Sequence, residues 1–185
     1  MDLRQLPASP APGEVNLVVE IPAGSRNKYE YNAEAGVMVL DRVLHSSVRY
    51  PFDYGFVPNT FAEDGAPLDG MVIMDESTFP GCLIRARPIG VLDLLHGGCR
   101  DGKLLCVPIA DQRKQHVVSI RQISPTQLAD VKEFFRTYRS LDGQSTTILG
   151  WLDQESVPAL LERCIAAAAA DRPVASGGPP PGPPP

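Results

Sequence analysis

The order of apolar and polar residues predicts β-strands in the first two thirds of the chain. The run Val15–Ile21 is rich in branched apolar residues, which favour strands. Charged and aromatic residues alternate over 28–32, and a second apolar run follows at Val37–Val43. A strand places alternate residues on opposite faces, so these two segments are expected to pair as a hairpin with Lys28 and Glu30 on one face.

Three further strands are expected beyond this hairpin, over 71–74, 82–94 and 103–109. Pro88 lies inside the second of them and indicates an edge or a bulge, because proline cannot donate a hydrogen bond to the neighbouring strand. Segment 50–59 is rich in Pro, Gly and aromatic residues and is expected to be a structured loop. The Gly-rich segment 95–102 is expected to be a flexible loop.

Helix signals come only late in the chain. Ser124, Pro125 and Gln127 combine an N-cap, a proline at the first helical position and a capping-box glutamine. Apolar residues then recur at helical spacing, at Leu128, Val131, Phe135 and Tyr138. A second helix is expected over 154–169. Strands followed by two helices predict an α+β, mainly β domain, most simply a small closed β-barrel with the helices packed outside.

The composition supports one domain, 1–170, followed by a tail, 171–185. The chain has 185 residues, of which 43% are hydrophobic and 21% charged, as is ordinary for a globular protein. Seven of its 19 prolines lie in the tail, among Gly and Ser. A segment of this composition cannot bury a core, so the tail is expected to be disordered.

Charge and cysteine usage narrow the function classes. The 17 basic and 22 acidic residues give a net charge of −5, which argues against a protein that binds nucleic acid or acidic membranes over a wide surface. We expect neither a signal peptide nor a membrane span, because no apolar run approaches the length that a span needs. Four cysteines without a Cys-x-x-Cys pair are too few for a disulfide scaffold, so reduced thiols in a cytoplasmic protein are expected.

The candidate chemistry centres on two aspartates. Asp64 and Asp69 lie five positions apart in a loop with Gly65 and Pro67, just before the run 71–74. Mg²⁺ takes one or two protein carboxylates and leaves positions for phosphate oxygens, so such a loop suits a metal site for a phosphorylated ligand. Taken alone, an acidic turn is more often a solvated surface loop.

Other polar side chains support a phosphate ligand. Acids, bases and tyrosines occur in nearly equal numbers: Glu20, Lys28, Glu30, Arg42, Tyr50, Tyr54, Asp64, Asp69, Asp101, Lys103, Tyr138 and Arg139. A metal pyrophosphate needs such a mixture, because carboxylates hold the cations while Lys, Arg and Tyr hold the remaining phosphate oxygens. An oligonucleotide-binding barrel fits less well, since the aromatic residues lie beside acids in Pro/Gly loops and do not alternate with Lys and Arg along a groove.

Nine motifs occur in order within residues 1–168: Glu20-Ile-Pro-Ala, Lys28-Tyr-Glu-Tyr, Asp41-Arg-Val, Tyr50-Pro-Phe-Asp-Tyr-Gly-Phe-Val-Pro-Asn-Thr, Glu63-Asp-Gly-Ala-Pro-Leu-Asp, Pro80-Gly-Cys, Arg87-Pro-Ile-Gly, Asp101-Gly-Lys and Phe134-Phe-Arg-Thr-Tyr-Arg. In sequence and spacing they resemble the soluble inorganic pyrophosphatases of the first family, most closely bacterial members of the cyanobacterial kind. The resemblance implies a closed five-stranded barrel of the OB type flanked by two C-terminal helices. It also implies a cytoplasmic homo-oligomer, often a hexamer, that hydrolyses pyrophosphate to two phosphates.

The resemblance also implies roles for individual residues. Several Mg²⁺ ions would share a water molecule and lower its pKa so that it attacks one phosphorus. The metal ligands would be Asp64, Asp69 and Asp101. The phosphate clamp would be Lys28, Arg42, Tyr54, Lys103, Tyr138 and Arg139. Glu20 and Glu30 would hold metal-bound waters, and Tyr50 would either orient a neighbour or simply be packed.

Two positions depart from the family pattern. The family motif reads Asp-x-Asp-Pro-x-Asp, and its middle aspartate, widely assigned as the general base, is Ala66 here. The metal-binding aspartate of the later loop aligns with His96, and a neighbouring position that is often acidic is Cys99. His96 is therefore either an altered ligand, which would favour Mn²⁺, Co²⁺ or Zn²⁺ over Mg²⁺, or a loop residue that binds nothing.

These departures leave two functions open. Loss of a general base typically costs about 10²–10⁴-fold in rate, so a slower metal-dependent diphosphatase is one hypothesis. The alternative is a non-catalytic paralogue that keeps the fold and the phosphate clamp and serves as a binding or assembly module.

Overall fold

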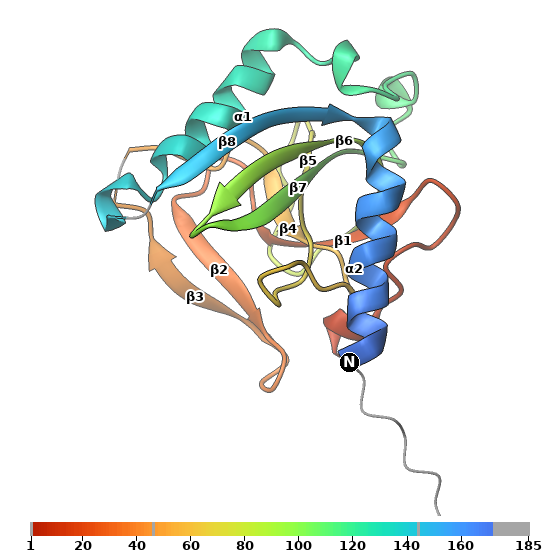
Figure 1. Cartoon of the computed structure of the whole chain (residues 1–185), viewed down its shortest axis with the longest axis horizontal. Helices are drawn as coiled ribbons and strands as arrows, with labels where there is room; N and C mark the ends of the chain where they lie inside the picture. Colours follow the sequence, from red (N-terminus) through yellow and green to blue (C-terminus); the bar gives the residue numbers. More distant parts are fainter. Residues whose placement is uncertain (1, 46, 144, 172–185) are drawn as a thin grey trace, which may run out of the picture.

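The computed structural model describes residues 2–45, 47–143 and 145–171. Its main sheet has the strand order β1-β4-β5-β7-β6-β8, and β1 also pairs with β6. Five strands therefore close into a ring, and β8 adds to the outside of β6 (Figure 1). The strands are β1 (Val15–Ile21), β4 (Asp53–Phe56), β5 (Asp69–Val72), β6 (Leu83–His96), β7 (Cys99–Pro108) and β8 (Thr146–Asp153). The closed five-stranded barrel of the prediction is confirmed.

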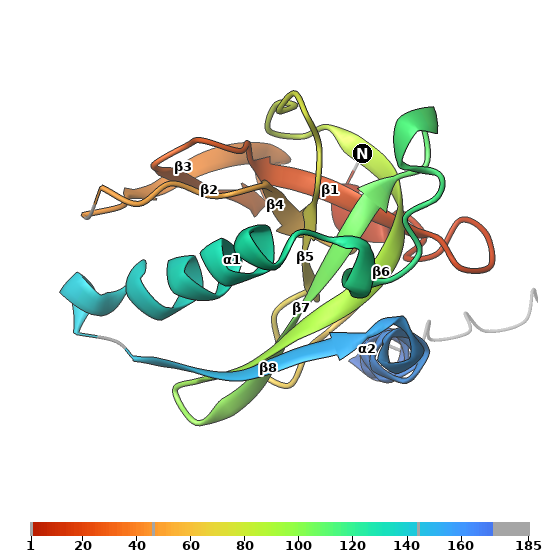
Figure 2. The same ribbon diagram turned by 90° about the horizontal axis from the view of Figure 1, so that it is seen from above.

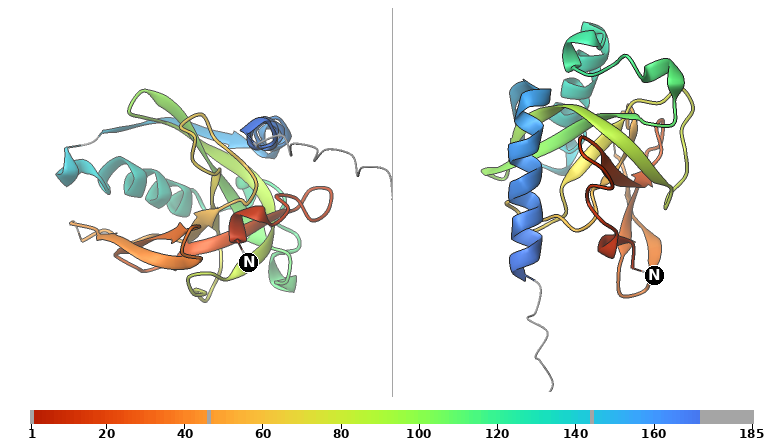
Figure 3. Two further views of the ribbon diagram at one scale, coloured as in Figure 1. Left: turned by 90° about the horizontal axis from the view of Figure 1, so that it is seen from below. Right: turned by 90° about the vertical axis from the view of Figure 1, so that its right-hand side faces the viewer.

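A separate hairpin and two helices complete the domain. The hairpin consists of β2 (Asn27–Asn32) and β3 (Val37–Val43), as the alternation of residues predicts. The helices are α1 (Pro125–Thr137) and α2 (Val157–Asp171), and short 3₁₀ turns lie at Leu3–Gln5, Gln112–Lys114, Ile120–Gln122, Ser140–Asp142 and Gln154–Ser156. In Figure 2, α1 lies between the hairpin and β8. The two views of Figure 3 show α2 at the other end of the barrel.

The strands bury alternate residues in two hydrophobic clusters. On β7, Leu105 and Val107 join the cluster that includes Phe134 and Phe135 of α1. Leu104 and Cys106 alternate with these residues along β7 and join the cluster that includes Val157 and Cys164 of α2. Each helix thus covers one of these two clusters. Burial of this much apolar surface is the main force that holds both helices on the barrel.

Three segments differ from the sequence-based expectation. Strand β4 forms within the expected loop 50–59, because the backbone of Asp53–Phe56 pairs with β1 on one side and β5 on the other. Strand β8 was not predicted. The expected flexible loop 95–102 is instead a tight hairpin, in which β6 runs on to His96 and β7 begins at Cys99. Gly97 and Gly98 have φ angles of 59° and 88°, a left-handed conformation that suits a two-residue turn.

The helix boundaries are close to those predicted, but the predicted capping box is wrong. Ser124 makes no side-chain cap hydrogen bond at the start of α1. A capping box forms instead at the preceding 3₁₀ turn, Ile120–Gln122, between Ser119 and Gln122. Pro88 lies at a register shift between β6 and β7, which confirms the predicted bulge. Helix α2 extends to Asp171, and residues 172–185 of the predicted tail lie outside the described residues.

Candidate active site

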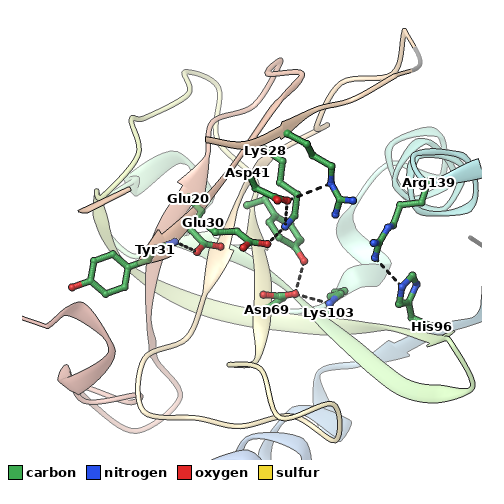
Figure 4. A network of polar contacts seen from close by, with 11 residues as sticks. Glu20, Lys28, Glu30, Tyr31, Asp41, Asp69, His96, Lys103 and Arg139 are labelled. Carbon is green, nitrogen blue, oxygen red and sulfur yellow. Dashed lines mark hydrogen bonds and ion pairs between the residues drawn. The ribbon is translucent and has the colours of Figure 1, made fainter. Parts of the chain in front are cut away.

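Side chains from the hairpin, β1, β4, β5 and β7 converge at the end of the barrel next to the hairpin (Figure 4). They border a cavity of about 280 Å³ whose lining includes Glu20, Lys28, Glu30, Tyr54, Ala66 and Asp69. A larger cavity of about 470 Å³ lies between α2 and the barrel and is lined mainly by apolar residues such as Leu160. None of the predicted site residues lines the larger cavity, whereas Glu20, Lys28, Glu30, Tyr54 and Asp69 all line the smaller one.

Lys103 lies at the centre of the site between two carboxylates. Its Nζ is 2.6 Å from Asp69 Oδ2 and 2.6 Å from Asp101 Oδ1. The Lys103 side chain is only 8% exposed, and Asp69 also accepts a hydrogen bond of 2.5 Å from the Tyr54 hydroxyl. Burial alone would lower the pKa of Lys103, but the charges of Asp69 and Asp101 outweigh it and raise that pKa. Lys103 is therefore a fixed cation inside the barrel end.

The hairpin supplies a second group of charges. Lys28 contacts Glu30 on the same strand and lies 3.0 Å from Asp41 Oδ2 on β3. Arg42 Nε lies 3.3 Å from the same carboxylate oxygen. Lys28 and Glu30 do share one face of β2, as the alternation predicts. The antiparallel register, which places Lys28 opposite Arg42, brings both cations to Asp41.

Tyr50 and Tyr138 are held by aromatic packing. Tyr50 is 2% exposed, and its ring centroid lies 4.7 Å from that of Phe134 and 5.3 Å from that of Tyr54. Tyr138 stacks on Phe134 at 5.1 Å, directly after α1. Burial raises the pKa of both hydroxyls above the ordinary tyrosine value. These tyrosines therefore offer neutral hydroxyls.

The carboxylates of Asp69 and Asp101 meet at Lys103, whereas Asp64 stands apart from that contact. Asp64 is exposed, and its Oδ1 accepts a hydrogen bond of 3.0 Å from the Ala66 amide in the loop between β4 and β5. Burial raises the pKa of Asp101, Lys103 opposes the rise, and the negative charges of Asp69 and Asp64 add to it. Among the described residues, no three His, Cys, Asp or Glu side chains are gathered closely enough to hold a metal ion together.

Glu20 is a partly buried acid within this site. Its Oε1 accepts a hydrogen bond of 2.8 Å from the Tyr31 amide. Burial, with a contribution from the charge of Asp69, nevertheless raises the pKa of Glu20 from 4.5 to about 8. In the metal-free protein Glu20 is therefore mostly protonated at neutral pH.

This shift predicts a pH-dependent stability. Above pH 4.5 the unfolded chain releases the Glu20 proton that the folded chain retains up to about pH 8. Stability from this group is thus full below pH 4.5 and is lost as the pH rises to about 8. Glu20→Gln keeps a neutral side chain at every pH. The melting temperature of the metal-free wild type should therefore fall relative to that of Glu20→Gln between about pH 5 and pH 9. A constant difference would contradict the assignment, and Glu133→Gln, on the exposed face of α1, is the control.

Two residues of the site were not predicted from the sequence. Arg4, in the first 3₁₀ turn, borders the 280 Å³ cavity. Hydrogen bonds tie the N-terminal segment to the barrel, from Leu3 N to the Tyr31 hydroxyl (3.1 Å) and from Asn59 N to Arg4 O (2.9 Å). Asp41 links the two hairpin cations. Asp41 stands in the Asp41-Arg-Val motif, but nothing local in the sequence marks Arg4.

This fold and site define a class of protein: a closed barrel with carboxylates and cations interleaved at one end, suited to a metal-bound phosphate ligand. A sequence model described as inorganic pyrophosphatase matches residues 17–169. Inorganic pyrophosphatases of Synechocystis sp. and Nostoc sp. are each 54% identical to this chain and align over 98% and 99% of their own lengths, or 89% and 90% of this chain. The crystal structure of the Thermus thermophilus inorganic pyrophosphatase superposes with a TM-score of 0.87 at 37% identity, covering 91% of this chain and 99% of that one.

The chain therefore belongs to the inorganic pyrophosphatase family, a family of metal-dependent diphosphatases. This confirms the resemblance, the fold class and the enzyme class that the motifs imply. Within the part of the chain that the structure describes, no helix is long and apolar enough to cross a membrane.

Proposed function

We propose that this chain hydrolyses pyrophosphate with Mg²⁺ ions held by Asp69, Asp101 and Asp64. The observation that carries the proposal is the position of Lys103 between Asp69 and Asp101, 2.6 Å from each. Two carboxylates that already share one cation are the hard oxygen donors that suit Mg²⁺. Bound cations would lower the pKa of a coordinated water and neutralise charge on the phosphates.

The clamp residues in this proposal are Lys28, Arg42, Tyr54, Lys103, Tyr138 and Arg139. Lys28 and Lys103 each contact two carboxylates, so both would exchange part of an internal ion pair for phosphate oxygens. Such charge-assisted hydrogen bonds are stronger than neutral ones and become stronger still as charge develops on the phosphates. The Tyr54 hydroxyl, whose pKa is raised by burial and by Asp69, remains a neutral donor throughout.

The remaining acids have supporting roles in this proposal. Glu20 and Glu30 border the same cavity as Asp69, and we assign them to waters around the metal ions. Ionisation of Glu20 would accompany cation binding, since nearby positive charge favours the carboxylate. Tyr50 packs between Tyr54 and Phe134, and we assign it to holding the Tyr54 ring in place.

Ala66 limits the rate in this proposal, because its methyl group cannot accept a proton from the attacking water. The test is phosphate release from pyrophosphate with Mg²⁺, Mn²⁺, Co²⁺ and Zn²⁺ in parallel, on protein shown to be folded. We expect slow turnover with Mg²⁺. No phosphate release with any of the four cations would leave the non-catalytic binding module as the function. The neutralisation of Asp69 and Asp101 by Lys103 would then explain the absence of turnover.

We further propose that the protein is a cytoplasmic homo-oligomer, and a hexamer by analogy with the bacterial members of the family. Its small-molecule ligands in this proposal are pyrophosphate and phosphate. The free cysteines Cys82, Cys99, Cys106 and Cys164 fit a reducing compartment. An apolar face on β3 supports the oligomer, since Leu40 and Val43 pair with Tyr29 and Asn27, on the face of the hairpin opposite to Lys28 and Glu30, and are 51% and 46% exposed. Exposed apolar faces of this kind typically mark protein interfaces.

The oligomer proposal makes a direct prediction. Leu40→Lys places a charge within this apolar face, where burial without a partner is unfavourable. Light scattering should therefore report a smaller assembly for Leu40→Lys than for the wild type. Val118→Lys, at a residue that is 44% exposed outside the hairpin, is the control and should keep the wild-type mass. A monomeric wild type, or an unchanged mass for Leu40→Lys, would contradict the proposed interface.

A further inference from the structure

His96 joins two other side chains at the edge of the site. Its Nε2 lies 2.8 Å from Arg139 Nη1, and its Nδ1 lies 3.3 Å from Thr146 Oγ1. Figure 4 shows the imidazole directed toward the guanidinium, to one side of the contact between Lys103 and Asp69. The pairing of β6 with β8 places His96 opposite Thr146, while Arg139 follows the end of α1. Three separate elements therefore meet at this ring.

The direction of these hydrogen bonds follows from the chemistry of the groups. Arginine has five N–H donors and no acceptor, so Nε2 must accept the hydrogen bond from Arg139. The proton of the neutral imidazole then lies on Nδ1, which donates to Thr146 Oγ1. Thr146 selects the tautomer that gives Arg139 an acceptor. The contact requires a histidine with an unprotonated Nε2.

Resting on the function proposed above, we propose that His96 is a positioning residue that orients Arg139 for the phosphate groups of pyrophosphate. Both ring nitrogens are used in protein contacts, so in this proposal His96 is neither an altered metal ligand nor a loop residue that binds nothing. The histidine that stands where the family has a metal-binding aspartate thereby acts on the substrate, through Arg139.

The state of the guanidinium supports this assignment. Arg139 Nε is buried and has no hydrogen-bond partner among the described residues. A buried donor without a partner is unfavourable in a folded protein. Because Nη1 is held by His96, the rest of the fork is fixed in orientation. A phosphate group offers two oxygens that such a fork grips together.

The test measures substrate and cation affinities separately. Calorimetry with imidodiphosphate, a non-hydrolysable analogue, at a saturating divalent cation should give a Kd about tenfold higher for His96→Ala than for the wild type. His96→Gln, whose side-chain oxygen can accept the same hydrogen bond, should stay within about threefold of the wild type. The Kd of the cation alone, without analogue, should be unchanged in both variants. His116→Ala, at an exposed histidine outside the site, is the matched control.

A double-mutant cycle then tests whether His96 acts through Arg139. The double variant His96→Ala, Arg139→Ala should bind the analogue no more weakly than Arg139→Ala alone, because the histidine has nothing left to orient. Thr146→Val keeps the imidazole and should also weaken analogue binding, which preserves the test if His96→Ala misfolds. Additive effects in the cycle, or weaker cation binding with unchanged analogue affinity, would overturn the proposal. Failure of the wild type to release phosphate would instead concern the proposed function, since these binding measurements need no turnover.

Discussion

Replacing Ala66 with aspartate should raise Mg²⁺-dependent turnover of pyrophosphate by about 10²-fold or more, the typical contribution of a general base. Ala66 borders the same cavity as Asp69 and Lys28 and is exposed, so a carboxylate added there meets no packed neighbour. The loop conformation rests on two contacts of the Ala66 backbone: its amide donates to Asp64 Oδ1 (3.0 Å), and its carbonyl accepts from Ala62 N (2.7 Å). Both contacts remain when only the side chain changes.

The measurement is the steady-state rate of phosphate release, with kcat and KM separated. The gain should appear in kcat, because a general base acts in the transition state and contributes little to binding of the ground state. Ala35→Asp, in the exposed turn of the hairpin, adds the same charge outside the cavity and should leave kcat unchanged. A folded Ala66→Asp protein with wild-type kcat would show that the rate is limited elsewhere in the site.

The barrel was largely predictable because its strands bury residues in a regular order. The hairpin of β2 and β3 and the strands β1, β5, β6 and β7 all follow apolar runs or alternation in the sequence. Strand β4 was missed because its four residues lie among prolines and aromatics, and only pairing with β1 and β5 makes them a strand. Strand β8 contains Gly150, which interrupts its pattern, and its pairing partner β6 lies far away in the sequence. Tertiary pairing decided both cases.

The site residues could be named from the sequence, but their partners could not. The motifs identify Lys103 and Asp69, yet nothing local shows that this buried lysine will contact a carboxylate 34 residues away. The contact between His96 and Arg139 spans 43 residues and joins a strand end to the segment after α1. The sequence therefore left two interpretations of His96, an altered metal ligand or a loop residue that binds nothing. The geometry supports a third, in which His96 orients Arg139. Side-chain contacts between distant elements depend on the register of the sheet, which local patterns do not specify.

Replacing Lys103 with methionine should have opposite effects on catalysis and on cation binding. In the proposed clamp Lys103 contacts the phosphates, so kcat/KM should fall by about 10²–10³-fold, as for other groups that stabilise developing charge. Asp69 and Asp101 would at the same time lose the cation that they share. Loss of one partner from a buried ion pair costs about 3–5 kcal/mol. Here Asp69 is 25% exposed and water screens part of its charge, so we expect about 2 kcal/mol and a Tm lower by roughly 4–8 °C without metal.

Added Mg²⁺ should reverse this loss of stability. Two carboxylates without an internal cation bind a divalent ion more tightly, and a ligand stabilises the folded state in proportion to the logarithm of its concentration over Kd. The increase in Tm on titration with Mg²⁺ should therefore be larger for Lys103→Met than for the wild type. Lys114→Met is the matched control: Lys114 lies 2.7 Å from Asp75, whose side chain is 51% exposed, and loss of such a surface pair costs at most about 1 kcal/mol. If Mg²⁺ stabilised Lys103→Met no more than the wild type, Asp69 and Asp101 would not be the carboxylates that hold the cation.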